Sequence, residues 1–190
     1  MKREYLLNAL GLSHQFMAAH IREGDLCIDA TAGRGRDALF LCRLVGETGR
    51  VIAIDIQADA VAQTTDLLAA EGCMDRVTVV QECHSRMGQY AAPESVAGIM
   101  FNFGWLPGGD HTTFSHGDTS VAALQAGLEL LKPGGVMTLC IYHGRENGTA
   151  ERDAILAWLP TVDNRRYTVI RGDFTNRTGD VPIPVFIIKE

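Results

Sequence analysis

Two acidic residues, Asp29 and Asp55, each follow a short apolar run, and a glycine-rich turn lies between them. The turn, residues 29–37, reads DATAGRGRD and leads into an amphipathic segment. Glycine lets a backbone approach a ligand closely, and an acid at the tip of the next strand can bind the two hydroxyls of a ribose. These residues predict a pocket for an adenosine-bearing cofactor.

Two cofactor classes fit this outline. Gly33, Gly35 and Ala38 match the Gly-x-Gly-x-x-Gly/Ala pattern of dinucleotide enzymes, with Asp55 about 20 residues further on. A dinucleotide site holds a pyrophosphate on backbone N–H groups, and a carboxylate at Asp29 would repel that anion. Asp29 suits the ammonium group of a methionine moiety, unless it is only a helix cap or a loop acid. We therefore favour S-adenosylmethionine over NAD.

The composition is that of an ordinary globular chain. Its 190 residues suit one domain, 1–190, and 46% of them are hydrophobic against 21% charged. No apolar run approaches the roughly 20 residues of a membrane span, and the first residues lack the apolar core of a signal peptide. The five cysteines form no Cys-x-x-Cys pair, so we expect no metal. These features predict a cytoplasmic protein without a membrane partner.

Apolar patterning predicts a helical lead-in over 1–24, with a helix at 5–20 that Gly11 could split, and then alternating strands and helices. Strands are expected at 26–29, 51–55, 77–81, 96–102, 136–142, 167–171 and 185–188. Helices are expected from Gly35 onward and at 58–71, 86–90, 120–131 and 149–158. Such alternation is typical of a parallel sheet covered on both faces. The short break before the last strand favours an antiparallel closing pair.

This order predicts an α/β fold of the Rossmann-like class I methyltransferase type. It has a seven-stranded, mostly parallel sheet with an antiparallel closing strand and helices on both faces. NAD domains typically end in a sixth parallel strand, so the closing pair again favours S-adenosylmethionine.

Ligands of an open parallel sheet bind beyond the carboxyl ends of its strands. His84 and Ser85 follow the third strand, where such folds cover the adenine. His84 stacks on that ring or bonds to it, or is a surface histidine, and Ser85 could instead cap the next helix. His143, beside Tyr142, follows the fifth strand and is a candidate base or substrate contact. Its unperturbed pKa of about 6.5 would leave it largely neutral.

The loop at 102–110 leaves the central fourth strand, beside the expected position of the cofactor's methyl group. Asn102 offers an amide oxygen and two N–H donors. Phe103 and Trp105 offer flat faces on which an unpaired RNA base can stack. The alternative is a packed loop with Trp105 as a core aromatic residue.

Four segments, 29–37, 55–57, 102–110 and 142–144, together resemble one bacterial family. It is that of the small class I methyltransferases described as putative rRNA methylases. Members are linked to tRNA methylation that makes 5-methylaminomethyl-uridine from 5-aminomethyl-uridine at the wobble position. The resemblance covers nearly the whole chain, including Ser13-His14 and the segment 176–184. The chain departs from the family pattern at Arg36, Ala38, Phe103, Trp105 and Ile183.

Patterns and resemblance together give three sets of candidate residues. Cofactor binding is expected at Asp29, Thr31, Ala32, Gly33, Gly35, Asp37, Asp55, Ile56, Gln57, His84, Ser85 and Asn102. Catalytic roles are expected for Asn102 and His143. Substrate contacts are expected at Gly104, Trp105, Leu106, Pro107, Tyr142 and His143.

The resemblance implies an S-adenosylmethionine-dependent RNA methyltransferase that releases S-adenosylhomocysteine. Its expected substrate is the 5-aminomethyl group of wobble uridine, in the anticodon region of a tRNA. A net charge of −6 argues against a large RNA-binding surface without excluding a small one. An rRNA or a small amine is the alternative acceptor. An NAD-dependent oxidoreductase and a non-catalytic RNA-binding module are alternatives of other classes. A homodimer is left open.

Overall fold

The computed structural model describes residues 7–104, 117–143 and 146–190. Its strands are β1 (Leu26–Asp29), β2 (Arg50–Asp55), β3 (Val77–Gln81), β4 (Val96–Phe103), β5 (Leu131–Ile141), β6 (Tyr167–Arg171) and β7 (Ile183–Lys189). Its α-helices are α1 (Ala9–His20), α2 (Arg36–Val45), α3 (Ala58–Ala70), α4 (Gly117–Leu130) and α5 (Glu146–Trp158). Two 3₁₀ helices, η1 (His84–Gln89) and η2 (Leu159–Thr161), complete the described elements.

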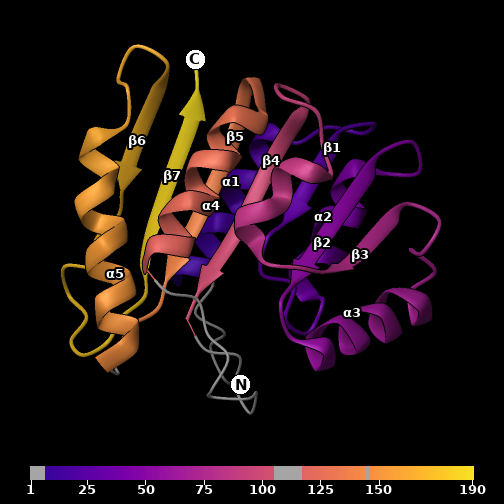
Figure 1. Ribbon diagram of the computed structural model, residues 1–190, viewed down its shortest axis with the longest axis horizontal. Helices are drawn as coiled ribbons and strands as arrows, with labels where there is room; N and C mark the ends of the chain where they lie inside the picture. Colours follow the sequence, from indigo (N-terminus) through magenta and orange to yellow (C-terminus); the bar gives the residue numbers. More distant parts are fainter. Residues whose placement is uncertain (1–6, 105–116, 144–145) are drawn as a thin grey trace.

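All seven strands pair in one sheet, in the order β3-β2-β1-β4-β5-β7-β6 (Figure 1). β1 to β5 run parallel, and β7 pairs antiparallel with both β5 and β6. This order confirms the predicted class I methyltransferase fold and its antiparallel closing strand. It also places β1 and β4, the strands that lead into the sequence motifs at 29–37 and 102–110, side by side at the centre of the sheet.

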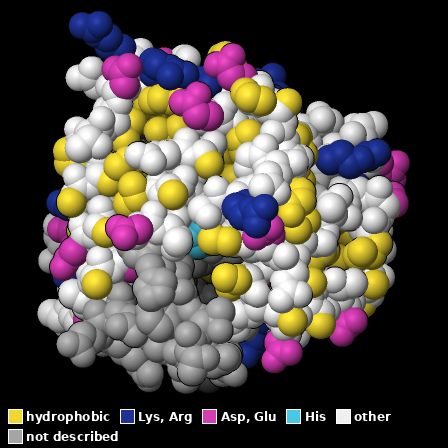
Figure 2. All heavy atoms as spheres, in the orientation of Figure 1, with side chains coloured by type: hydrophobic (Ala, Val, Ile, Leu, Met, Phe, Trp, Pro, Cys, Tyr) yellow, Lys and Arg dark blue, Asp and Glu magenta, His cyan; other side chains and the backbone are white. Residues whose placement is uncertain are grey.

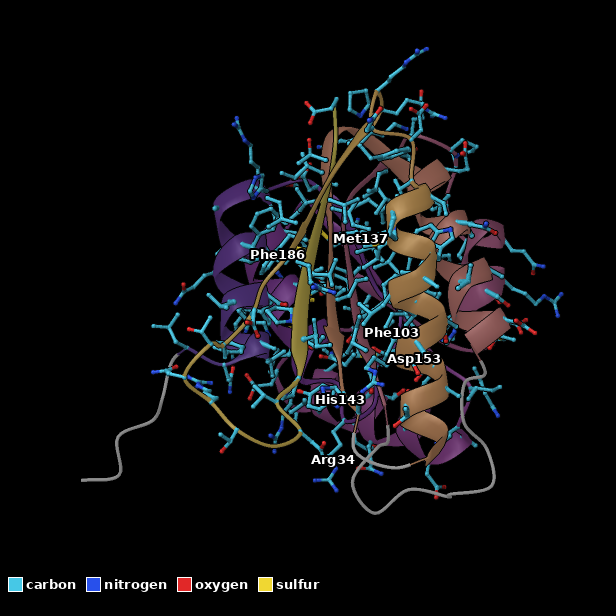
Figure 3. The ribbon with its side chains drawn as sticks, turned by 90° about the vertical axis from the view of Figure 1, so that its left-hand side faces the viewer. Arg34, Phe103, Met137, His143, Asp153 and Phe186 are labelled. Atoms are coloured by element: carbon cyan, nitrogen blue, oxygen red, sulfur yellow. The ribbon has the colours of Figure 1, made fainter. Side chains whose placement is uncertain are left out.

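Two hydrophobic clusters cover the two faces of the sheet. One packs α1, α2 and α3 against it, and the other packs η1, α4 and α5. Figure 3 shows the helices on both sides of the strands. Because side chains alternate along a strand, Asp29 points to the α1–α2 face while Ile28 points to the α4 face. Met100 pairs with Asp29 and shares its face, so Asn102 does too.

Several predicted boundaries shift. α1 begins at Ala9, because the Asn8 side chain accepts the Gly11 N–H at 2.6 Å and caps the helix. Gly11 does not split this helix. α4 and α5 each begin three residues before the predicted start.

β5 begins at Leu131 rather than at residue 136. Leu131 pairs with Val96, and Val136 pairs with Gly98, so the sequence between Leu131 and Val136 forms an irregularity within the strand. The Lys-Pro-Gly-Gly segment at 132–135, which lies between the predicted helix at 120–131 and the predicted strand at 136–142, is therefore accommodated within the strand by a shift of register.

Within the described ranges, no helix has the length and apolarity needed to cross a lipid bilayer. The same residues contain no group of three or more histidine, cysteine, aspartate or glutamate side chains that could hold a metal ion.

Candidate active site

The carboxyl ends of the parallel strands meet at one edge of the sheet, toward which the arrows of β4 and β6 point in Figure 1. Figure 3 shows Arg34 and His143 at this same end of the molecule. The described residues that follow β1, β2, β3, β4 and β5 therefore lie at the same end of the sheet, as the sequence predicts.

The glycine turn after β1 is held by its neighbours. The Ala32 N–H donates to the Ile54 carbonyl at 2.9 Å. Gly33 and Gly35 have φ angles of +53° and +76°, in the left-handed region that glycine tolerates. A Cβ on Gly35 would lie 2.9 Å from the Thr64 Cα of α3. Gly35 thus allows α3 to pack directly on the turn, a requirement separate from ligand approach.

Asp29 is fully buried at the end of β1. Its Oδ1 accepts the Thr31 N–H at 3.2 Å, while its Oδ2 has no hydrogen-bond partner among the described residues. Burial raises the pKa of Asp29 well above its usual range, and the nearby Asp37 carboxylate adds to that rise. Asp55 raises this pKa further, against the lowering effects of the Thr31 and Ala38 backbone N–H groups.

Asp55, at the end of β2, accepts two backbone N–H groups. The Gly33 N–H donates to Oδ2 and the Gln57 N–H donates to Oδ1, both at 2.9 Å. Asp55 therefore ties the glycine turn to the start of α3. Each carboxylate oxygen keeps a further lone pair that could accept a ribose hydroxyl. Ile56, just beyond β2, has an exposed side chain.

Asn102, near the end of β4, is fixed at two points by the loop after β1. Its backbone N–H donates to Thr31 Oγ1 at 2.8 Å. Its side-chain Nδ2 donates to Asp37 Oδ2 at 2.6 Å. The Asn102 Oδ1 is buried and has no partner among the described residues. Hydrogen bonds therefore join Asn102, which begins the second sequence motif, to the loop at 29–37.

His84 and Ser85 lie at the start of η1, on the other face of the sheet from Asn102. His84 contacts the stacked rings of Phe101 and Phe103 edge-on, at 6.1 Å from each centroid. Burial lowers the pKa of His84 to about 4, so the ring is neutral, and its Nε2 lacks a partner among the described residues. Ser85 does not cap η1, and its hydroxyl instead meets Cys83 Sγ at 3.1 Å.

His143 and Tyr142 follow β5. His143 Nε2 lies 3.0 Å from the Val181 carbonyl, to which it donates, and Nδ1 lies 3.7 Å from Asp180 Oδ1. Both ring nitrogens thus face the segment before β7. Burial raises the pKa of Tyr142 to about 12. A Cβ on Gly104 would lie 2.8 Å from the Tyr142 Cβ.

The predicted contacts Trp105, Leu106 and Pro107 lie outside the described residues. Sequence reasoning missed two residues that the structure brings to the site. Thr64 Oγ1 donates to the Gly33 carbonyl at 3.2 Å, and His14 Nε2 lies 2.7 Å from Asp37 Oδ1. Ser13-His14 was noted in the resemblance, but nothing in the helical pattern of α1 distinguishes His14 from a surface residue.

The site is acidic and has an unsatisfied acceptor. Asp29, Asp37 and Asp55 lie close enough for the last two to raise the pKa of the first, and Asp29 Oδ2 is unpaired. This fits a cationic ligand such as S-adenosylmethionine, which carries an ammonium and a sulfonium. It does not fit the pyrophosphate of NAD, which the carboxylates of Asp37 and Asp55 would repel. Asp29 could hold the ammonium, and Asp55 could hold the ribose.

Comparison with known proteins agrees with this geometry. The family model described as Putative rRNA methylase matches residues 51–188. The chloroplastic tRNA (mnm(5)s(2)U34)-methyltransferase of Arabidopsis thaliana is 38% identical over 194 residues, which cover 95% of this chain and 69% of the relative.

Two solved structures extend the comparison. A putative rRNA-methylase from Clostridium thermocellum is 42% identical with a TM-score of 0.93, over 96% of this chain and 98% of that one. A putative methyltransferase from Streptococcus mutans, solved in complex with SAH, is 28% identical with a TM-score of 0.86. That similarity covers 96% of this chain and 98% of the other. These similarities confirm the predicted family and decide against an NAD-dependent oxidoreductase. The chain belongs to the Putative rRNA methylase family and is an S-adenosylmethionine-dependent methyltransferase.

Proposed function

We propose that this enzyme methylates the exocyclic amine of 5-aminomethyl-uridine at the wobble position of a tRNA. The observation that carries the proposal is the Asn102 side chain. Its Nδ2 is committed to Asp37, and its buried Oδ1 has no partner among the described residues. An amide oxygen can only accept a hydrogen bond, so the group it meets must bring a hydrogen. A primary amine does so.

When bound, S-adenosylmethionine supplies a methyl group on a sulfonium, a leaving group that needs no acid. The protein's part is then to bind, orient and keep the acceptor nitrogen neutral. A low-dielectric pocket favours a neutral amine over an ammonium. One N–H donated to Asn102 Oδ1 would fix the direction of the nitrogen lone pair, and such positioning supplies much of the acceleration in a two-reactant step.

The name of the Arabidopsis relative supports a tRNA acceptor, since it specifies U34. The distribution of charged side chains supports a small RNA-binding surface. Figure 2 shows the lysine and arginine side chains of the described surface in view scattered among acidic and hydrophobic ones. With a net charge of −6, the chain suits recognition of one unpaired nucleotide better than of a long duplex.

The direct test uses tRNA from a strain that accumulates 5-aminomethyl-uridine. Purified enzyme and S-adenosylmethionine should convert that nucleoside to its methylamino form, seen by mass analysis of the digested tRNA. Fully modified tRNA is the matched control and should not react. Release of S-adenosylhomocysteine with no change in the wobble nucleoside would contradict the proposal.

Ribosomal RNA is the second candidate acceptor, because the family description names it. The same assay with rRNA from a deletion strain separates the two. Methylation of rRNA without methylation of undermodified tRNA would replace the first proposal by the second.

Replacing Asp55 by alanine is expected to weaken S-adenosylmethionine binding by about 1.5–3 kcal/mol, the scale of a hydrogen bond to a charged group. It should also lower the melting temperature, because the Gly33 and Gln57 N–H groups lose their acceptor. Calorimetric titration of the folded variant measures the affinity. Asp59→Ala removes an exposed acid from the first turn of α3 and is the control for charge. Unchanged affinity in Asp55→Ala would exclude the ribose role.

A further inference from the structure

We propose that His14 and Asp37 are positioning residues that fix the orientation of the Asn102 side-chain amide, which makes α1 part of the active site. The proposal rests on the role of Asn102 in the proposed function. His14 Nε2 lies 2.7 Å from Asp37 Oδ1, and Asn102 Nδ2 lies 2.6 Å from Asp37 Oδ2. The three side chains form one chain of hydrogen bonds from α1 through α2 to β4.

The carboxylate of Asp37, which lies between His14 and Asn102, determines which groups donate in these hydrogen bonds. A carboxylate only accepts, so both of its neighbours must donate. The His14 Nε2 therefore carries a hydrogen, and the Asn102 amide turns its nitrogen toward Asp37. If the amide rotated by half a turn, its oxygen would face the Asp37 carboxylate and repel it. Asp37 thereby determines that Oδ1 is the atom available to an acceptor amine.

His14 restrains Asp37 in turn. Its ring stacks on Phe40 of α2, with centroids 4.0 Å apart and an angle of 10° between the planes. The His14 side chain is 31% exposed, whereas the Asp37 side chain is 8% exposed. Asp37 is thus held between a rigid histidine and the amide that it orients. Without His14, its Oδ1 loses this partner and the carboxylate can rotate.

α1 contains its own matched control. His20 is half-buried like His14 and also touches an aromatic ring, that of Phe16 at 4.4 Å. Its Nδ1 is 2.8 Å from the Phe16 carbonyl within the same helix. His20 shares the residue type, helix and degree of burial of His14, and its contacts described here stay within α1.

The kinetic test compares His14→Ala, His14→Gln, Asp37→Asn and His20→Ala. His14→Ala should lower the single-turnover methylation rate about tenfold, with cofactor affinity within about threefold of wild type, because only geometry is lost. His14→Gln retains a side-chain N–H donor and should recover most of the rate. Asp37→Asn should cost more, since an amide at position 37 can donate and lets the Asn102 amide turn. His20→Ala should react at the wild-type rate.

A second measurement needs neither substrate nor cofactor. In a proton–nitrogen NMR spectrum, the side-chain amide signals of Asn102 are identified as those that disappear in Asn102→Ala. Hydrogen bonding to a carboxylate should shift one of their protons downfield. His14→Ala should move these signals and His20→Ala should not.

Three outcomes would overturn the inference. They are a His14→Ala rate within twofold of wild type, an equal loss in His20→Ala, and Asn102 signals unchanged in His14→Ala. If wild-type enzyme fails to methylate tRNA, the proposed function fails, while the amide spectrum still decides whether His14 and Asp37 orient Asn102.

Discussion

Asn102→Ala is expected to lower the single-turnover rate of tRNA methylation by about 100-fold or more, the scale of losing a donor or acceptor placed for the transition state. Cofactor affinity should stay within about threefold of wild type, because the Asn102 backbone N–H still donates to Thr31 Oγ1. The loss comes from removing Oδ1, which is buried and unpaired among the described residues. Rapid quench with undermodified tRNA and excess enzyme measures the step directly.

Asn164→Ala is the matched control for this experiment. Asn164 is exposed and precedes β6. It therefore lies at the amino ends of the parallel strands, at the end of the sheet opposite to the site. Its loss should leave the rate unchanged. A rate within fivefold of wild type for Asn102→Ala would mean that another group orients the acceptor. His143 would then be the next residue to test, although its nitrogens face the segment at 180–181.

The fold could be predicted from the sequence because its strongest signals are local. The apolar run that ends at Asp29 is too short for a helix, and the one that ends at Asp55 is also followed by turn residues. Both form strands with the predicted carboxyl ends. The boundary of β5 was wrong because Lys-Pro-Gly-Gly ordinarily ends an element. Here the pairing of Leu131 with Val96 continues the strand across it, a tertiary effect that a local pattern does not contain.

The site could be predicted only in part, for a related reason. Asp29, Asp55 and Asn102 could be found because Asp29 and Asp55 end their strands and Asn102 lies one residue before the end of β4. The carboxyl ends of parallel strands share one edge of the sheet. Their partners could not. The contact of His14 with Asp37 depends on how α1 packs against α2, and periodicity gives the apolar face of a helix without naming its neighbour. Likewise, nothing local shows that Asp55 accepts the Gly33 N–H.

The sequence of the turn admitted two cofactor classes, and the three acids distinguish between them. A glycine pattern describes backbone space, which both ligands need. Charge separates them. Asp29 carries an unpaired, buried oxygen beside two further carboxylates, and a proton or a cationic ligand relieves the repulsion, whereas an anion would add to it. In the free protein the ionised form of Asp29 is therefore disfavoured, and a bound cationic ligand would stabilise it. Both the affinity and the proton exchange of Asp29 can be measured.

Asp29→Asn is expected to weaken S-adenosylmethionine binding by about 3–5 kcal/mol, the cost of leaving a buried charge without its partner. The melting temperature of the free protein should not fall, because burial and the nearby Asp37 and Asp55 already disfavour the ionised form of Asp29, and the amide carries no charge. Asp55→Ala should behave differently and lose stability as well as affinity, since its oxygens serve backbone donors.

Binding should also release protons. The pKa of Asp29 is raised well above its usual range in the free protein, so the carboxyl is protonated at pH values below that raised pKa. A bound ammonium favours the ionised form and lowers this pKa, so the proton must leave. Affinity should therefore rise with pH up to the raised pKa of the free protein and level off above it. Titration calorimetry in two buffers of different ionisation enthalpy measures the release. Asp29→Asn should abolish it. Proton exchange of equal size in wild type and Asp29→Asn, with equal affinity, would show that the ammonium is held by another group.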